Sequence, residues 1–331
     1  MYHKIVLKSI LKASQWLTLL FIAVPSIAIS QYTDVINSNR PGLSVSAYAV
    51  GKNVVQAEFG PLYEQRDHAD LNTTSNIFGA DLSLRYGLLF EELEINYEGT
   101  FVSQNISFDN FDLEERRTDF SRNRLGLKYL IYDRYKNDKP NLYSWRKDNL
   151  FQLRNLIPSV SLYGGATFNL GDNPFYPEDP TISYRGMVAT QSRLTPRFVL
   201  ITNVAYDRIS TDFPELSYLV SLQHAFRNPK WSVFVEHQGI DSDRYSDLLL
   251  RTGVVHLFSE NFQADFNLGA SFKSTPSRIF ISTGFSYRLD FHKDELKPVQ
   301  QQQPKSKIGR KAMKKRKKGR KKNRKKDKVD F

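Results

Sequence analysis

One stretch of the chain, Phe78-Gly79-Ala80-Asp81-Leu82-Ser83-Leu84-Arg85-Tyr86, alternates strictly between two kinds of side chain. The even-numbered residues, from Phe78 to Tyr86, are Phe, Ala, Leu, Leu and Tyr. The odd-numbered residues between them are Gly, Asp, Ser and Arg. Successive side chains of a β-strand point to opposite faces, so this stretch predicts a strand with one apolar and one polar face. A soluble sandwich can contain such a strand, so the number of similar stretches decides the fold.

Twelve such stretches occur between Val54 and Phe291. Only helices and closed barrels satisfy every backbone group in lipid. The pattern therefore predicts an all-β fold, a transmembrane antiparallel barrel of about 12 strands over residues 53–291. The expected strands are 54–63, 76–86, 92–101, 122–131, 158–168, 183–193, 198–206, 216–226, 231–238, 248–257, 262–272 and 279–291.

The connections between these stretches alternate in length. Short ones (87–91, 194–197, 227–230 and 258–261) alternate with longer, more polar ones (64–75, 102–121 and 169–182). Short periplasmic turns and longer outer loops are typical of bacterial outer-membrane barrels. The connection 132–156 is an exception, because it is long on the periplasmic side. It is either a short amphipathic helix at the membrane surface or a loop packed under the barrel.

The first 30 residues resemble a signal peptide. Three lysines precede an apolar run from Trp16 to Val24, and small residues near Ser30 suit cleavage. The predicted organisation is 1–30 signal peptide, 31–52 periplasmic lead-in, 53–291 outer-membrane barrel and 292–331 polybasic disordered tail.

The chain has no Cys, which excludes disulfides and Cys-based metal sites. An even strand number places both termini in the periplasm of a Gram-negative cell.

The net charge of +12 is divided unevenly along the chain. Residues 292–331 hold 18 Lys or Arg and 4 Asp or Glu, and residues 1–30 add three Lys, which leaves −5 for 31–291. So basic a tail is disordered by self-repulsion and binds polyanions. Its anion-binding candidates are Arg310, Lys311, Lys314, Lys315, Arg316, Lys317, Lys318, Arg320, Lys321, Lys322, Arg324, Lys325 and Lys326.

The expected partners of an exported tail are not nucleic acids. They are membrane lipid, a periplasmic polyanion (lipid headgroups or cell wall) or an acidic protein partner, which would include a larger outer-membrane complex. Deleting residues 304–331 is expected to leave the barrel inserted, because its apolar belt ends at Phe291. That last strand places Phe285, Tyr287, Leu289 and Phe291 on one face and resembles the signal that the outer-membrane assembly machinery reads.

Several motifs resemble a known family. They are Asn39-Arg40-Pro41-Gly42, Gly51, Gln56-Ala57-Glu58-Phe59-Gly60, Leu84-Arg85-Tyr86-Gly87-Leu88 and Glu92-Leu93-Glu94. Together they resemble the transporter-like outer-membrane barrels named after the meta-pathway of phenol degradation, over most of 38–291. The resemblance implies an outer-membrane location and passage of small, hydrophobic compounds. The basic tail and the Gln at the expected mature N-terminus resemble proteins of the Bacteroidota, whose barrels often join large assemblies.

The polar face of the predicted strands is the candidate site. Its charged members are Asp81, Arg85, Glu94, Glu98, Arg124, Lys128, Glu236, Arg251, Asp265 and Arg288. Adjacent strands would bring Arg85 near Glu94 or Glu98, and Glu98 near Arg124 or Lys128. Two readings remain: a polar pore whose charges set selectivity, or a lumen filled by paired charges.

No enzyme is expected. A barrel lipase needs Ser and His two residues apart on a lipid-facing strand, and His224, His237 and His256 lack that spacing. No acidic run has metal-ligand spacing, so no catalytic residue, metal or cofactor is predicted. The expected function is a transporter-like or porin-like barrel that passes or binds small solutes. The alternative is a structural subunit of an outer-membrane assembly or secretion complex, docked through the tail.

Overall fold

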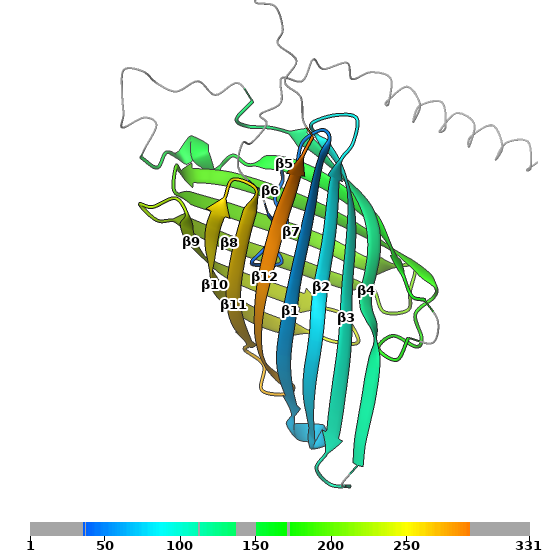
Figure 1. The fold of residues 1–331 in the computed structure, drawn as a ribbon. Helices are drawn as coiled ribbons and strands as arrows, with labels where there is room; N and C mark the ends of the chain where they lie inside the picture. The colour runs from blue at the N-terminus through cyan, green and yellow to red at the C-terminus, as the bar shows by residue number, and fades with distance from the viewer. Residues whose placement is uncertain (1–35, 37, 112, 137–149, 171–172, 292–331) are drawn as a thin grey trace, which may run out of the picture. The chain divides into compact units, whose positions relative to one another are not determined.

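Twelve antiparallel strands form one closed barrel (Figure 1). The computed structural model describes residue 36 and residues 38–111, 113–136, 150–170 and 173–291. The strands are β1 (Val54–His68), β2 (Thr73–Gly87), β3 (Leu93–Phe108), β4 (Leu113–Tyr132), β5 (Ser159–Phe168), β6 (Ile182–Thr195), β7 (Phe198–Ile209), β8 (Glu215–Ala225), β9 (Trp231–Asp241), β10 (Asp247–Ser259), β11 (Phe262–Ser271) and β12 (Ser277–Asp290), with short 3₁₀ helices η1 (Ala69–Leu71) and η2 (Leu153–Leu156).

Each strand pairs with its neighbours in sequence, and β12 closes the ring against β1. That seam runs from the pair Val54 and Asp290 to the pair Asp67 and Ser277. Closure satisfies the backbone groups of both edge strands, as a lipid environment demands. We call the end that holds Val54 and Asp290 the near end. The far end holds the β1–β2 connection and every second connection after it.

The outer face of the barrel is apolar and the inner face is polar. On β12, Phe285 and Tyr287 are exposed while Ser286 and Arg288 are buried, and on β2 Leu84 is exposed while Arg85 is buried. At the near end, histidines pack against aromatic rings: His224 lies 4.2 Å from Phe198 between ring centroids, and His256 lies 4.3 Å from Trp231. The alternation therefore confirms the predicted transmembrane barrel and its strand number.

The predicted loops 64–75 and 102–121 are wrong for most of their length. The β1–β2 ladder continues to His68, and the β3–β4 ladder continues to Leu113. These stretches carry polar side chains on both faces, so the alternation is hidden in the sequence. Ion pairs within this extension hold it: Glu64 lies 2.8 Å from Arg66 and 2.6 Å from Arg278 of β12. The third long connection, between β5 and β6, is a loop.

The connection 132–156 is only partly described. Its described part contains the single 3₁₀ turn of η2, and residues 137–149 lie outside the described residues. The predicted signal peptide at 1–30 and the predicted disordered tail at 292–331 also lie outside them. Docking through the tail, and binding of a polyanion by it, therefore stay predictions. Within the described ranges, no helix is long and apolar enough to cross a membrane.

Candidate functional site

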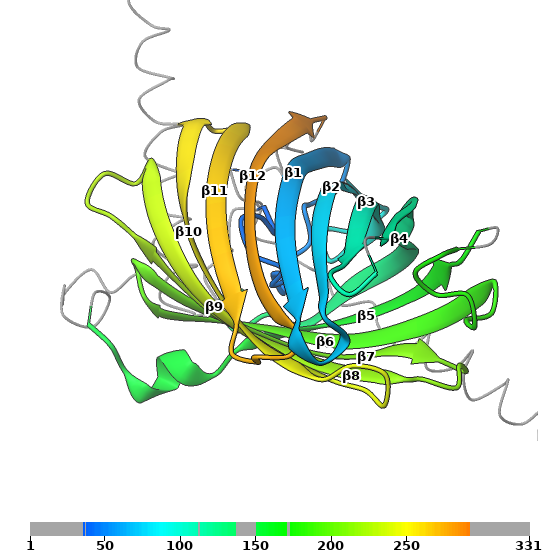
Figure 2. The same cartoon turned by 90° about the horizontal axis from the view of Figure 1, so that it is seen from below.

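The described residues 38–51, just before β1, lie inside the barrel (Figure 2). We call residues 38–51 the inner segment. Its backbone and side chains bond to lumen-facing side chains around the ring of strands, and Figure 2 shows the blue coil of these residues inside that ring. The sequence predicted a lead-in at 31–52 but did not predict its position within the lumen. The barrel is therefore a strand wall around an internal length of its own chain.

The inner segment meets successive strands as it crosses the lumen. Val45 N–H donates to Asn203 Oδ1 of β7 at 2.6 Å, and Asn203 Nδ2 donates back to Val45 O at 2.8 Å. Ser46 Oγ donates to Gln191 Oε1 of β6 at 2.7 Å. The hydroxyls of Tyr48 and Ser159 of β5 lie 2.8 Å apart. Asn203 thus satisfies both backbone groups of Val45, which β-sheet pairing does not reach, and the other two contacts join side chains of the segment to the wall.

The start of the inner segment is fixed against β12, β1 and β11. Ser38 Oγ lies 2.8 Å from Ser286 Oγ. The guanidinium of Arg40 donates to both oxygens of Asp265, at 3.1 and 3.2 Å, and to Thr283 O at 2.9 Å. Bidentate pairing of this kind fixes the orientation of a guanidinium as well as its position. Asp265, one of the predicted lumen residues, therefore faces the lumen and pairs with Arg40 of the inner segment.

Two glycines make room for Arg40. A Cβ on Gly60 of β1 or on Gly284 of β12 would overlap the Arg40 guanidinium. Gly60 and Arg40 both belong to motifs that carry the family resemblance. The two residues, 20 positions apart in sequence, therefore meet in the lumen.

We expect Gly284→Ala to displace Arg40 and to lower the free energy of unfolding by about 1–3 kcal/mol, as overpacking of a filled interior does. Urea unfolding of the barrel in lipid vesicles measures this. The control is Gly186→Ala on β6, where a Cβ meets nothing within 4 Å. Equal stability of the two variants would contradict the close seating of Arg40.

A carboxylate on β9 binds the middle of the segment. Glu236 accepts the N–H of Leu43 at 3.0 Å and the N–H of Ser44 at 2.9 Å. Arg251 of β10 lies 2.5 Å from the same carboxylate and balances its charge. Glu236 and Arg251 were both predicted to face the lumen, and the structure places them together around the segment.

A buried triad of charges binds the last part of the segment. Glu94 of β3 lies 2.9 Å from Arg85 of β2 and 2.8 Å from Lys128 of β4, and all three side chains are inaccessible to solvent. Lys128 Nζ donates to the carbonyls of Ser46 and Tyr48, each at 2.9 Å. Val50 N–H donates to Glu94 at 2.8 Å. The triad therefore joins three strands to the inner segment.

A second charge cluster lies on β3, β4, β6 and β7. Arg124 lies 3.3 Å from Glu98 and 2.6 Å from Asp207, and Arg185 lies 2.7 Å from the same oxygen of Asp207. The remaining predicted residues pair locally. Asp81 accepts from Thr100 at 2.6 Å, and Arg288 lies 3.0 Å from Asp290. The residues that the sequence prediction missed include Arg40, Asn203, Gln191, Arg185 and Asp207.

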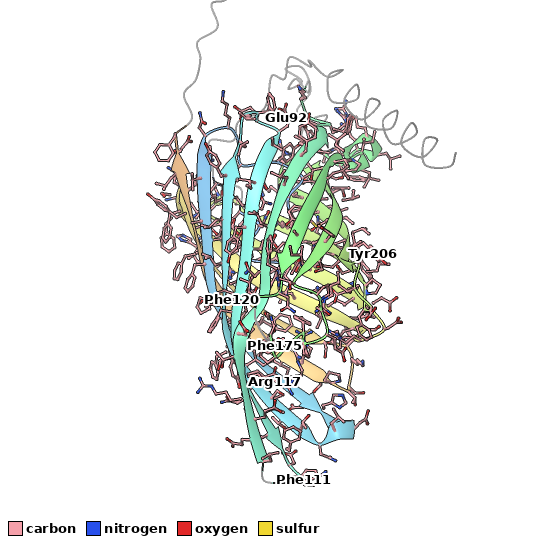
Figure 3. The ribbon with its side chains drawn as sticks, turned by 90° about the vertical axis from the view of Figure 1, so that its right-hand side faces the viewer. Glu92, Phe111, Arg117, Phe120, Phe175 and Tyr206 are labelled. Atoms are coloured by element: carbon pink, nitrogen blue, oxygen red, sulfur yellow. The ribbon has the colours of Figure 1, made fainter. Side chains whose placement is uncertain are left out.

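A cavity of about 670 Å³ lies between the inner segment and the far end. Residues of the segment, including Arg40, Leu43 and Val45, form its floor, and its walls come from strands all round the barrel. Figure 3 shows Phe120 and Phe175 where β4 lies beside the β5–β6 connection, with Arg117 further along β4 toward Phe111. Asn173 of that connection donates to Phe120 O at 2.8 Å.

The fold and the lumen define a class of protein: a transmembrane β-barrel with an internal segment and a polar cavity between that segment and the far end. Residues 38–289 match the family described as "Putative MetA-pathway of phenol degradation", and the chain belongs to that family. This confirms the resemblance predicted from the sequence. The matched range begins inside the inner segment, so the segment is part of the family's domain.

Several solved structures are similar in fold at low identity. An outer-membrane channel from Pseudomonas putida F1 is 11% identical, with a TM-score of 0.47, over 77% of this chain and 100% of that chain. The KdgM porin is 10% identical, with a TM-score of 0.40, over 71% and 99% of the two chains. The CymD monoaromatic hydrocarbon channel is 11% identical, with a TM-score of 0.37, over 74% and 90%. Curated proteins gave no match.

Proposed function

We propose that the protein is an outer-membrane channel for small polar solutes, held shut at rest by its inner segment. The observation that supports this most directly is the cavity, which is lined by residues of the far-end connections and by residues of the inner segment. A solute entering from the far end meets Arg40, Leu43 and Val45 before it can reach the near end. The near end, where β1 begins and β12 ends, faces the periplasm in this proposal.

The chemistry of the lumen favours polar solutes over hydrophobic ones. The wall around the cavity carries charged side chains from most strands, among them Glu98, Arg124, Arg185 and Asp207. A hydrophobic solute would displace water from these groups without replacing its hydrogen bonds, which is unfavourable. The passage of hydrophobic compounds, implied by the family resemblance, is therefore not part of this proposal.

The inner segment is held by polar contacts that water can replace, as the movement of a gate requires. They are hydrogen bonds and ion pairs to the wall rather than a large apolar core. The two apolar clusters that the segment shares with the rest of the barrel are small: Val45 belongs to one, and Ala47 and Tyr48 belong to the other. Water that enters the lumen can replace hydrogen bonds, whereas it cannot replace apolar packing. Movement of the segment as a unit is therefore the step that would connect the cavity to the near end.

We expect the purified full chain to show heat-modifiable migration on gels and rare, discrete openings in planar lipid bilayers. Closed barrels resist unfolding by detergent until heated, and a resting barrier at the inner segment limits the current. Membrane fractionation of cells that express the chain checks its location. A soluble protein without a heat shift, or a membrane barrel that never conducts, would count against the proposal.

A further inference from the structure

The cavity presents arginines to the solvent. The residues that line it include ten Arg and six Asp or Glu. Three of these arginines come from different parts of the barrel: Arg66 on β1, Arg122 on β4 and Arg244 in the β9–β10 connection. None of the three belongs to the lumen charges predicted from the sequence. All three line the same cavity, so a solute that enters it meets their guanidinium groups.

In three of the ion pairs of these arginines the cation is more exposed than the anion; in a fourth, Arg244 lies 3.3 Å from Glu178, and the exposed fractions are 27% for Arg244 and 67% for Glu178. The side chain of Arg66 is 34% exposed and its partner Glu64 is 10% exposed. The values are 36% for Arg122 against 22% for Glu98, and 27% for Arg244 against 8% for Asp179. Arg122 and Glu98 are also 4.0 Å apart, at the limit of an ion pair. In the pairs of Arg66 and Arg122 the guanidinium is therefore the more exposed partner, and Arg244 lies between one buried and one exposed carboxylate.

One guanidinium nitrogen on the cavity wall has a free donor. Arg244 Nη1 is buried and has no hydrogen-bond partner among the described residues. An unsatisfied buried donor is costly, and an anionic ligand would satisfy it. Arg244 lies outside the strands, so it can adjust to a ligand more easily than a wall residue.

Aromatic rings lie among these arginines. Phe175 and Tyr176 of the β5–β6 connection and Tyr245 of the β9–β10 connection line the same cavity. The guanidinium of Arg208 stacks on Tyr176 at 3.8 Å from its ring centroid, and that of Arg244 lies 4.6 Å from the ring centroid of Phe213. The cavity volume is within the range of small-molecule sites. Its wall therefore combines flat apolar faces with cationic donors.

We propose that this cavity binds small aromatic carboxylates, with the carboxylate at Arg122 and Arg244 and the ring against Phe175 and Tyr176. The inference rests on the proposed channel, because it names the class of solute that enters it. A carboxylate is the anion whose two oxygens match the donors of a guanidinium. An aromatic ring distinguishes such a solute from acetate or chloride, which carry the charge alone.

Benzoate is the probe, with benzyl alcohol as the neutral control and acetate as the control without a ring. Binding to the full-chain barrel in detergent is measured by calorimetry at low and high salt. We expect benzoate to bind more tightly than either control, and its affinity to fall with salt. Arg122→Gln and Arg244→Gln are each expected to weaken benzoate binding about tenfold, the loss of one charge-assisted hydrogen bond.

The matched control is Arg116→Gln, on β4 like Arg122 but outside the residues that line the cavity. It removes the same charge, and the basic tail is present in every variant. Heat-modifiable migration shows that each variant is folded, and Arg244→Gln changes no strand. Equal affinity for benzoate and benzyl alcohol, or equal losses in the Arg116 and Arg122 variants, would overturn the inference. Conduction without benzoate binding would contradict the binding site but not the channel. Benzoate binding without conduction would contradict the channel but not the binding site.

Discussion

Oxidation is expected to abolish channel openings in a Ser38→Cys, Ser286→Cys variant, and reduction is expected to restore them. The two hydroxyl oxygens lie 2.8 Å apart, so the Cβ atoms are close enough for a disulfide. The inner segment already continues into β1 at its other end. A crosslink at Ser38 therefore fixes both ends of the segment, and it can no longer leave the lumen.

The chain suits this experiment because it contains no Cys. The introduced pair has no competing thiols, and the single variant Ser286→Cys is a matched control that cannot crosslink within one chain. Single-channel recordings before and after addition of reductant compare the two states in the same bilayer. If the oxidised and reduced forms conduct equally, solutes pass beside the segment, and the segment is a fixed part of the wall.

Local alternation was sufficient to predict the strands. The starts of β7, β9 and β11, at Phe198, Trp231 and Phe262, were predicted at the observed residues. Each follows a tight turn, where a change from polar turn residues to an aromatic one marks the boundary clearly. The far ends of β1–β4 were not predicted, since Glu64-Gln65-Arg66-Asp67 is polar on both faces and only its cross-strand partners show it to be a strand.

The lumen charges illustrate a different limit. Alternation predicts that Arg85 and Glu94 point inward, but their pairing depends on the register between β2 and β3. Arg85 lies opposite Asn96, and Glu94 lies opposite Gly87, so the pair forms diagonally. Lys128 lies directly opposite Glu94. The sequence left open whether Glu98 lies near Arg124 or Lys128; the structure pairs Glu98 with Arg124, and Lys128 pairs with Glu94 instead.

The inner segment could not be located from local pattern. Its contacts with the wall join residues as far apart in sequence as Val45 and Asn203. Residues 43–50 also alternate, as a strand would, although they form none. Two features of the sequence could have indicated a segment inside the lumen. One is the motif Asn39-Arg40-Pro41-Gly42 before the barrel, and the other is the set of inward-facing carboxylates such as Glu58 and Glu236. Those carboxylates bind backbone N–H groups of the segment, a role that charge pairing between strands does not suggest.

The second large effect is expected at the triad. Glu94→Gln should lower the free energy of unfolding by about 3–5 kcal/mol, the cost of leaving a buried charge without its partner. The change keeps the size of the side chain but removes the negative charge that lies between Arg85 and Lys128. It also weakens the acceptor for Val50 N–H. Urea unfolding in lipid vesicles measures the loss, and planar bilayers should show more frequent openings, because the triad holds the inner segment.

Two further variants separate charge from packing in this triad. Glu114→Gln, exposed at the far end of β4, makes the same chemical change and should alter stability by less than about 0.5 kcal/mol. The double variant Glu94→Gln, Lys128→Gln removes one of the cations that the single change leaves uncompensated. It should be more stable than the sum of the two single changes predicts, as coupled neighbours are. Strictly additive losses would show that the three side chains act independently, and the triad would then not be what joins the inner segment to the wall.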